Sequence, residues 1–252
     1  MKGIILAAGR GSRMGCMTDA RPKCLTVLAG RSLLDWQLSA LKCAGVRDVT
    51  VIRGYRKECL RGPGYHTADN ERWAETNMVA TLQCAHDLLA AGPVVVSYGD
   101  IVYHPEHLRA LAAARAPIAI TYDTLWRSLW GERFEDPSED VETFEAAAGR
   151  LQEIGGRPTD MDAVQGQYMG LLRFTPSGWG QVLDCLAALP AEGRPKLDMT
   201  SLLRALLTRD VEIETVGVDG GWCEVDCAQD VAIYTGRLRQ PGWAHDWRWS
   251  ES

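Results

Sequence analysis

The chain has 252 residues, which is enough for one large domain or two small ones. Apolar residues make up 46% of it and charged residues 24%, which is typical of globular proteins and excludes a disordered or collagen-like chain. The formal net charge of -6 argues against a nucleic-acid partner. The sequence lacks the roughly 20 consecutive apolar residues of a membrane span, and its apolar start soon turns polar, so we expect a cytoplasmic protein without a membrane partner.

Strands and helices alternate along the first half of the chain. Lys2–Ala7 is an apolar run that ends in small residues and a glycine-rich turn, as a buried parallel strand does. In chain order, we then expect a helix over 32–44, a strand over 48–52, a helix over 76–89, a strand over 93–97, a helix over 106–115 and a strand over 117–122. This alternation predicts an α/β fold, a Rossmann-like three-layer sandwich whose mostly parallel sheet binds ligands outside its carboxyl ends.

The pattern changes in the second half of the chain. Residues 123–149 mix aromatic and acidic residues, and we predict an inserted lid or helix-loop that contains no strand. Later strands are expected over 150–154, 166–174 and 211–218, and helices over 176–189, 199–208 and 228–239. We therefore predict a single domain over 1–239, followed by a tail over 240–252 that is rich in tryptophan. Such a tail docks on its own domain or on a second subunit more often than it binds substrate, which is compatible with a homodimer.

The loop after the first strand has the sequence LAAGRGSRMG, and RPK follows at residues 21–23. Glycines let backbone N–H groups turn toward an anion, and Arg10, Arg13 and Lys23 add positive charge, so the loop predicts a triphosphate cradle. It lacks the GxxxxGK[ST] of a P-loop, and Met14 replaces the third glycine of a dinucleotide motif. The alternative is a loop whose glycines only permit tight packing, although such a loop needs no cations.

LAAGRGSRMG followed by RPK resembles the signature of the sugar-nucleotide type nucleotidyltransferase superfamily, LAAGxGxRxG with PK downstream. Further similar segments are NERWAETNMVATL (70–82), SYGDIVY (97–103), the LW and RFEDP of the insert, GQYMGLLRF (166–174), LDMTSLL (197–203) and WCEVDCAQD (222–230). Together they resemble the CTP-dependent branch that activates phosphocholine and small phosphonates. The resemblance covers about residues 1–235, and it implies the fold of nucleotide-diphospho-sugar transferases.

The resemblance implies an enzyme, a cytidylyltransferase that moves CMP from CTP to a small phosphonate or phosphate monoester and releases pyrophosphate. Lys23 resembles the family lysine that bridges the α-phosphate and the acceptor, and Arg13 resembles the arginine that holds pyrophosphate. The expected nucleotide-binding residues are Leu6, Ala8, Gly9, Gly11, Thr76, Asn77 and Asp100. Helix-cap or turn roles compete for Thr76 and Asn77.

The resemblance also implies Mg²⁺ as the cofactor, because phosphoryl chemistry needs charge neutralisation and this hard ion prefers carboxylates. Asp100 follows an apolar strand, which places it at the ligand-binding edge of the sheet, and Asp226 matches the second aspartate of the family. Turn or cap roles are the alternatives for both, and capping fully explains Asp198. As exposed strand-end carboxylates, Asp100 and Asp226 are expected to contribute little to stability.

The side chains expected near the acceptor favour two different kinds of acceptor. The acceptor-binding candidates are Trp126, Trp130, Tyr168 and Glu224, which suit a quaternary ammonium or a primary amine, as in aminoethylphosphonate. Three arginines in the same neighbourhood, Arg127, Arg133 and Arg173, would instead suit a carboxylated phosphonate. A small phosphonate is slightly favoured over phosphocholine, and a sugar 1-phosphate is a second alternative. Each tryptophan also has a simpler interpretation as core packing.

Overall fold

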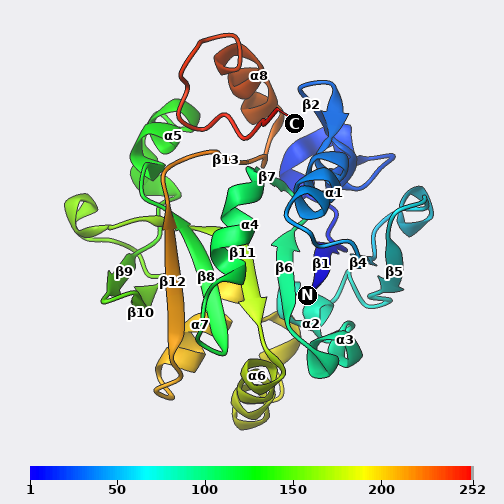
Figure 1. Cartoon of the computed structure of the whole chain (residues 1–252), viewed down its shortest axis with the longest axis vertical. Coiled ribbons are helices and arrows are strands. Elements are labelled where there is room, and N and C mark those ends of the chain that lie inside the picture. Colours follow the sequence, from blue (N-terminus) through cyan, green and yellow to red (C-terminus); the bar gives the residue numbers. More distant parts are fainter. Residues whose placement is uncertain (251–252) are drawn as a thin grey trace.

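A nine-stranded sheet runs through the computed structural model, which describes residues 1–250 (Figure 1). The strands are β1 (Lys2–Ala7), β4 (Val49–Arg53), β5 (His66–Asp69), β6 (Val94–Tyr98), β8 (Ile118–Asp123), β9 (Phe144–Ala147), β10 (Arg150–Ile154), β11 (Gln167–Phe174) and β12 (Ile213–Val218). Their order in the sheet is β5-β4-β1-β6-β11-β8-β12-β10-β9. Only β10 and β11 run against the other strands of this sheet, so the predicted mostly parallel α/β fold is confirmed.

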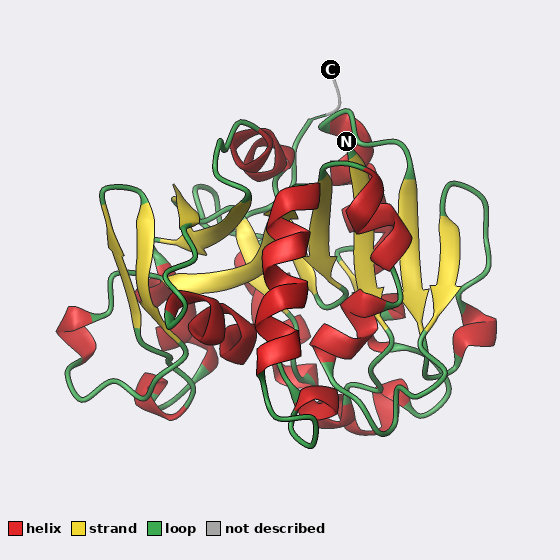
Figure 2. Cartoon of the chain, turned by 90° about the horizontal axis from the view of Figure 1, so that it is seen from below, coloured by secondary structure: helices red, strands yellow, loops and turns green. Residues whose placement is uncertain are grey.

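Helices lie on both faces of the sheet (Figure 2). They are α1 (Leu33–Cys43), α2 (Met78–Gln83), α3 (His86–Ala91), α4 (Pro105–Ala112), α5 (Trp126–Arg133), α6 (Pro176–Ala188), α7 (Met199–Leu207) and α8 (Ala228–Arg237). α1 packs beside α4, whereas α6 packs against α3 and α7. The single helix expected over 76–89 is wrong, because Ala85 leaves helical geometry (φ -104°, ψ 21°) and separates α2 from α3. Across residues 1–250, the helices are too short or too polar to span a bilayer.

The core strand and the first helix form for reasons visible in the sequence. β1 has parallel neighbours on both sides, β4 and β6, and its Ile4 and Ile5 are fully buried. An apolar strand at the centre of a covered sheet is therefore expected. α1 begins after Ser32, whose side chain accepts a hydrogen bond from the Asp35 N–H group, and Gly45 follows its end with a φ of 86°.

The 123–149 segment contains one strand, which corrects the prediction that it has none. β9 lies at the edge of the sheet and pairs with β10 in antiparallel register. Phe144 stacks on Tyr122 at 4.6 Å between ring centroids and anchors this short strand. Four residues are too few for the alternating pattern that identifies a strand from sequence. The same segment also contributes α5, in agreement with the expected helix-loop.

A separate two-stranded sheet lies beyond the main one. It pairs β7 (Ile101–Tyr103) with β13 (Trp222–Glu224) in antiparallel register, so that Glu224 lies opposite Ile101. Neither strand was predicted. A short hairpin of β2 (Val27–Leu28) and β3 (Arg31–Ser32) precedes α1.

The tryptophan-rich tail docks on its own domain. Trp247 is fully buried and meets Trp36 of α1 edge-on, with ring centroids 6.1 Å apart. His245 Nε2 lies 2.8 Å from Oδ2 of Asp123, and both side chains are buried. The Gly221 N–H group, just before β13, donates to the carbonyl of Ala244 at 2.7 Å. The tail therefore secures the strand that carries Glu224.

Candidate active site

Three carboxylates meet at the carboxyl ends of β1 and β6. Asp100 follows β6, which lies beside β1 and its glycine-rich loop. The pairing of β7 with β13 continues into a hydrogen bond from the Val225 N–H group to the carbonyl of Asp100, at 2.9 Å. Asp100, Glu224 and Asp226 consequently offer oxygens that all lie within 4.8 Å of one another.

Lys23 lies between two of these carboxylates. Its Nζ donates to Oδ2 of Asp100 and to Oδ1 of Asp226, each at 2.7 Å. Burial lowers the pKa of Lys23, but the two carboxylates outweigh this effect and raise its pKa above the ordinary value. The lysine therefore keeps its charge. Gly11, with a φ of 68°, leaves room for its stem, since a Cβ there would lie 2.8 Å from Lys23 Cδ.

Asp226 is a buried acid surrounded by cations. In addition to Lys23, its Oδ1 accepts from Nη2 of the exposed Arg13 at 2.9 Å, while its Oδ2 accepts from Nη2 of Arg133 at 3.1 Å. Burial alone would raise the pKa of Asp226, but Lys23 and Arg13 lower it to about 2. The expectation of an exposed strand-end carboxylate is wrong for Asp226, because Lys23, Arg13 and Arg133 surround it and only 6% of the residue is exposed.

The pKa of Glu224 is shifted in the opposite direction. Burial and the neighbouring charge of Asp226 raise its pKa well above the ordinary value, and Arg133 and Lys23 only partly oppose them. One site thus holds a carboxylate that ionises readily and another that resists ionisation.

The three carboxylates fit a hard divalent cation. Asp100 Oδ1 is buried and has no hydrogen-bond partner within residues 1–250, so one ligand atom is free. Carboxylate oxygens are the ligands that Mg²⁺ prefers, and the ion would also need phosphate oxygens or waters. Mg²⁺ remains a prediction for this site.

Two adjoining cavities hold the expected nucleotide residues. One, of about 290 Å³, is lined by Leu6, Gly9, Gly11, Arg13, Lys23 and Asp100 among others. The other, of about 90 Å³, is lined by Leu6, Ala8, Gly9, Trp73, Thr76, Asn77, Met78 and Thr81. Asn77 also caps α2 by accepting from the Met78 N–H group, so the capping role and the cavity position coexist.

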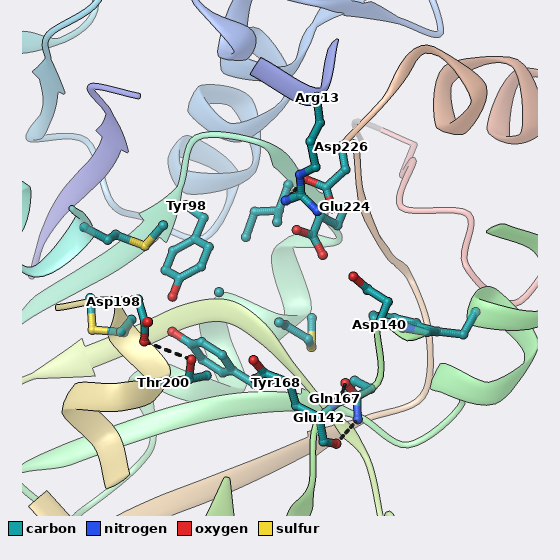
Figure 3. Close-up of a pocket in the computed structure, with 16 residues that line it drawn as sticks. Arg13, Tyr98, Asp140, Glu142, Gln167, Tyr168, Asp198, Thr200, Glu224 and Asp226 are labelled. Carbon is teal, nitrogen blue, oxygen red and sulfur yellow. Dashed lines mark hydrogen bonds and ion pairs between the residues drawn. The ribbon is translucent and has the colours of Figure 1, made fainter. Parts of the chain in front are cut away.

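A third cavity, of about 340 Å³, is also lined by Arg13 (Figure 3). Five carboxylates line it: Asp140, Glu142, Asp198, Glu224 and Asp226. Trp130, Tyr98 and Tyr168 add aromatic surface, and the hydroxyl of Tyr168 is buried without a hydrogen-bond partner among the described residues. This cavity is therefore acidic and aromatic.

Three of the four residues predicted to bind the acceptor line this cavity. Trp130, Tyr168 and Glu224 line it, but Trp126 is buried outside its lining. Asp140 and Glu142 were missed, although the acidic composition of the insert was a signal. Asp198 lines the cavity while it caps α7 through the Ser201 N–H group.

The three arginines expected near the acceptor do not line this cavity in the described structure. Arg127 pairs with Asp162, and Arg173 donates to the carbonyl of Ala116. Arg133 is buried in an ion-pair network with carboxylates. These three arginines are therefore not among the residues that give this cavity its charge.

Known proteins resemble this chain in fold and in sequence. Residues 3–167 match the MobA-like NTP transferase domain. The chain is 32% identical to a CTP:phosphoglutamine cytidylyltransferase of Campylobacter jejuni, over 92% of this chain and 98% of that protein. It is 34% identical to a 2-aminoethylphosphonate cytidylyltransferase of Lancefieldella rimae, over 42% of this chain and 45% of that protein. The solved inositol-1-phosphate CTP transferase from T. maritima shares the fold, with a TM-score of 0.72 at 16% identity over 95% of this chain and 96% of that one. The chain belongs to the MobA-like NTP transferase domain family, within the nucleotidyltransferase superfamily.

Proposed function

We propose that the protein transfers CMP from CTP to a small acceptor that carries a phosphonate or phosphate group together with an ammonium group. One observation carries this proposal: the glycine-rich cavity with Lys23 and the acidic, aromatic cavity meet at Arg13, which lines both. A cationic acceptor and a triphosphate can thus bind side by side.

The reaction needs positioning and charge neutralisation more than a protein nucleophile. An oxygen of the acceptor's phosphonate attacks the α-phosphorus, the bond to the bridging oxygen breaks, and pyrophosphate leaves. Lys23 would hold the α-phosphate and the attacking oxygen together, and Arg13 would bind the departing pyrophosphate. Asp100 and Asp226 would hold Mg²⁺, which neutralises charge on phosphate oxygens when it is bound.

The charge of the cavity supports an aminoalkylphosphonate over a carboxylated phosphonate. Its lining carries Asp140, Glu142 and Asp198 in addition to Asp226, which is already paired with cations, and Glu224, which resists ionisation. Arg13 is the cation among them. An ammonium group is attracted by this lining, whereas a carboxylate is repelled. A sugar 1-phosphate offers no cation to these acids. We therefore favour an acceptor that resembles 2-aminoethylphosphonate.

A phosphorylated amino acid is the second candidate, because the similarity to the phosphoglutamine enzyme extends over nearly its whole length. Such an acceptor also carries an ammonium group. The unpartnered Tyr168 hydroxyl offers a donor for its carboxylate. Phosphocholine has no N–H group to donate, so it would depend on cation–π contact with Trp130 or Tyr168.

Pyrophosphate release in the presence of Mg²⁺ tests the proposal. CTP, UTP, ATP and GTP are each combined with 2-aminoethylphosphonate, phosphoglutamine, phosphocholine, a carboxylated phosphonate and glucose 1-phosphate. We expect release with CTP and an ammonium-bearing acceptor. Turnover with glucose 1-phosphate or the carboxylated phosphonate alone would overturn the charge argument, and preference for another nucleotide would overturn the assignment of CTP.

A further inference from the structure

Arg133 makes the most extensive buried ion-pair network at this site. It lies in the last turn of α5, and its side chain is only 1% exposed. Its Nε donates to Oδ1 of Asp230 and its Nη2 to Oδ2 of Asp226, each at 3.1 Å. Nη1 lies 3.7 Å from Oε2 of Glu224. The guanidinium thus faces three acids, and two of them, Glu224 and Asp226, line the acidic, aromatic cavity.

Asp230 holds the same segment from the other side. Its Oδ2 accepts from the backbone N–H groups of Asp226 at 2.6 Å and of Cys227 at 3.0 Å, at the start of α8. The backbone of Asp226 is therefore fixed by Asp230, while its side chain is fixed by Arg133. Since Arg133 also binds Asp230, the three residues form a closed set of contacts.

These contacts determine which oxygen of Asp226 remains available. Arg133 takes Oδ2, so only Oδ1 faces Lys23, Arg13 and the space between the carboxylates. We propose that Arg133 and Asp230 are positioning residues, which orient Asp226 so that it presents this single oxygen to the cations of the reaction. The assignment rests on the proposed function, in which Asp226 holds the metal. It gives the inserted α5 a role in the active site.

The simpler explanation is that Arg133 only joins α5 to α8. A second ion pair between the same helices provides the matched control: Glu132, next to Arg133, pairs with Arg237 through Oε2 and Nε at 3.1 Å. This pair does not include Asp226. If α5 and α8 merely need to be joined, Glu132→Gln and Arg133→Lys should have similar effects.

The test compares Arg133→Lys with Glu132→Gln. A lysine keeps the charge, but its single ammonium cannot reproduce the planar contacts to Asp226 and Asp230. Mn²⁺ affinity is measured by electron paramagnetic resonance, with and without CTP, beside kcat, KM for CTP and the thermal midpoint. We expect Arg133→Lys to weaken Mn²⁺ binding and lower kcat by about 10- to 100-fold, the range for residues that orient metal ligands. KM for CTP should stay near the wild-type value in Arg133→Lys. In Glu132→Gln, both the Mn²⁺ affinity and kcat should stay near the wild-type values.

Asp230→Asn is the second variant if Arg133→Lys fails to fold. Its amide oxygen can still accept from the backbone N–H groups, but its NH₂ group faces Arg133 and breaks the pair, so the same losses are expected. Wild-type Mn²⁺ affinity in a folded Arg133→Lys or Asp230→Asn protein overturns the proposal, as does an equal loss in Glu132→Gln. If the wild-type protein releases no pyrophosphate with any acceptor, the proposed function fails, whereas the Mn²⁺ titration still tests the orientation of Asp226.

Discussion

Lys23 donates to Asp226 over 2.7 Å across 203 positions of sequence, and the same ammonium lies 2.7 Å from Asp100. The lysine thus stands between two carboxylates that would also attract a divalent cation. A divalent cation bound here would compete with the ammonium for this position. We infer that the phosphates of an incoming nucleotide draw the ammonium away, so that metal and nucleotide bind together.

Replacing Lys23 with methionine tests this competition. Loss of the ammonium should increase the affinity of the nucleotide-free protein for Mn²⁺ by about tenfold or more, since two carboxylates lose their counter-ion. Turnover should fall by at least about 100-fold, because no cation remains for the α-phosphate. Isothermal titration with Mn²⁺ and a pyrophosphate assay measure the two effects, and Lys23→Arg, which keeps the charge, is the control. Unchanged Mn²⁺ affinity in Lys23→Met would contradict the competition.

Asp226→Asn should destabilise the protein in a pH-dependent way. The pKa of Asp226 is lowered from 3.8 to about 2, so its ionised form contributes about 2 kcal/mol to the free energy of unfolding. This contribution is present above about pH 4 and is lost as the pH falls toward 2. Urea unfolding at pH 7 and at pH 3 measures the difference, with the exposed Glu135→Gln as control. A deficit that does not shrink at pH 3 contradicts the assignment.

Glu224→Gln should have the opposite effect on stability. Because the pKa of Glu224 is raised by burial and by Asp226, the protonated form suits the fold, and its stability contribution is lost as the pH rises through the raised pKa. The amide resembles the protonated form, so the thermal midpoint of the variant should exceed wild type increasingly from pH 5 to pH 9. KM for an ammonium acceptor should change little, because the amide replaces a side chain that already favours its uncharged form. A constant midpoint difference across this range is the contrary result.

Gly11→Ala should strain the backbone at position 11 and displace the side chain of Lys23. The φ of 68° is unfavourable for alanine, and its Cβ would lie 2.8 Å from Lys23 Cδ, so we expect a loss of about 1–3 kcal/mol in the free energy of unfolding. Gly9→Ala is the matched control in the same loop, since a Cβ there meets open space within the described residues. Denaturant unfolding of both variants provides the comparison. Equal stability of the two would show that Gly11 is not sterically required.

His245→Ala tests the docking of the tail. It removes the hydrogen-bond partner of Oδ2 of the fully buried Asp123, and leaving a buried acceptor unsatisfied in this way costs about 1–3 kcal/mol. The double variant with Asp123→Asn should recover part of this loss, because the uncompensated charge is removed. Thermal unfolding of the single and double variants measures the coupling. Additive losses would mean that the two side chains act independently.

Seven of the nine strands of the main sheet could be predicted, because buried strands are continuous apolar runs, whereas β5 and β9 have only four residues each. β7 and β13 were not predicted, because strands of three residues are too short to show an alternating apolar pattern. Their pairing nevertheless brings Asp226 close to Asp100. The glycine-rich loop marked Lys23 and Arg13 through local sequence alone. The buried state of Asp226 had no such signal, since Arg133, which covers Oδ2, lies 93 positions away in the insert.

The position of β13 near the end of the chain has a consequence for synthesis. Lys23, Arg13 and Asp100 emerge from the ribosome more than 120 residues before Glu224, Asp226 and the docking tail. Until then, Lys23 lacks one of its two carboxylate partners, and the β7 edge has no β13 to pair with. A growing chain therefore holds Lys23, Arg13 and Asp100 without Glu224 and Asp226, and the cluster of three carboxylates forms only after β13 has been made.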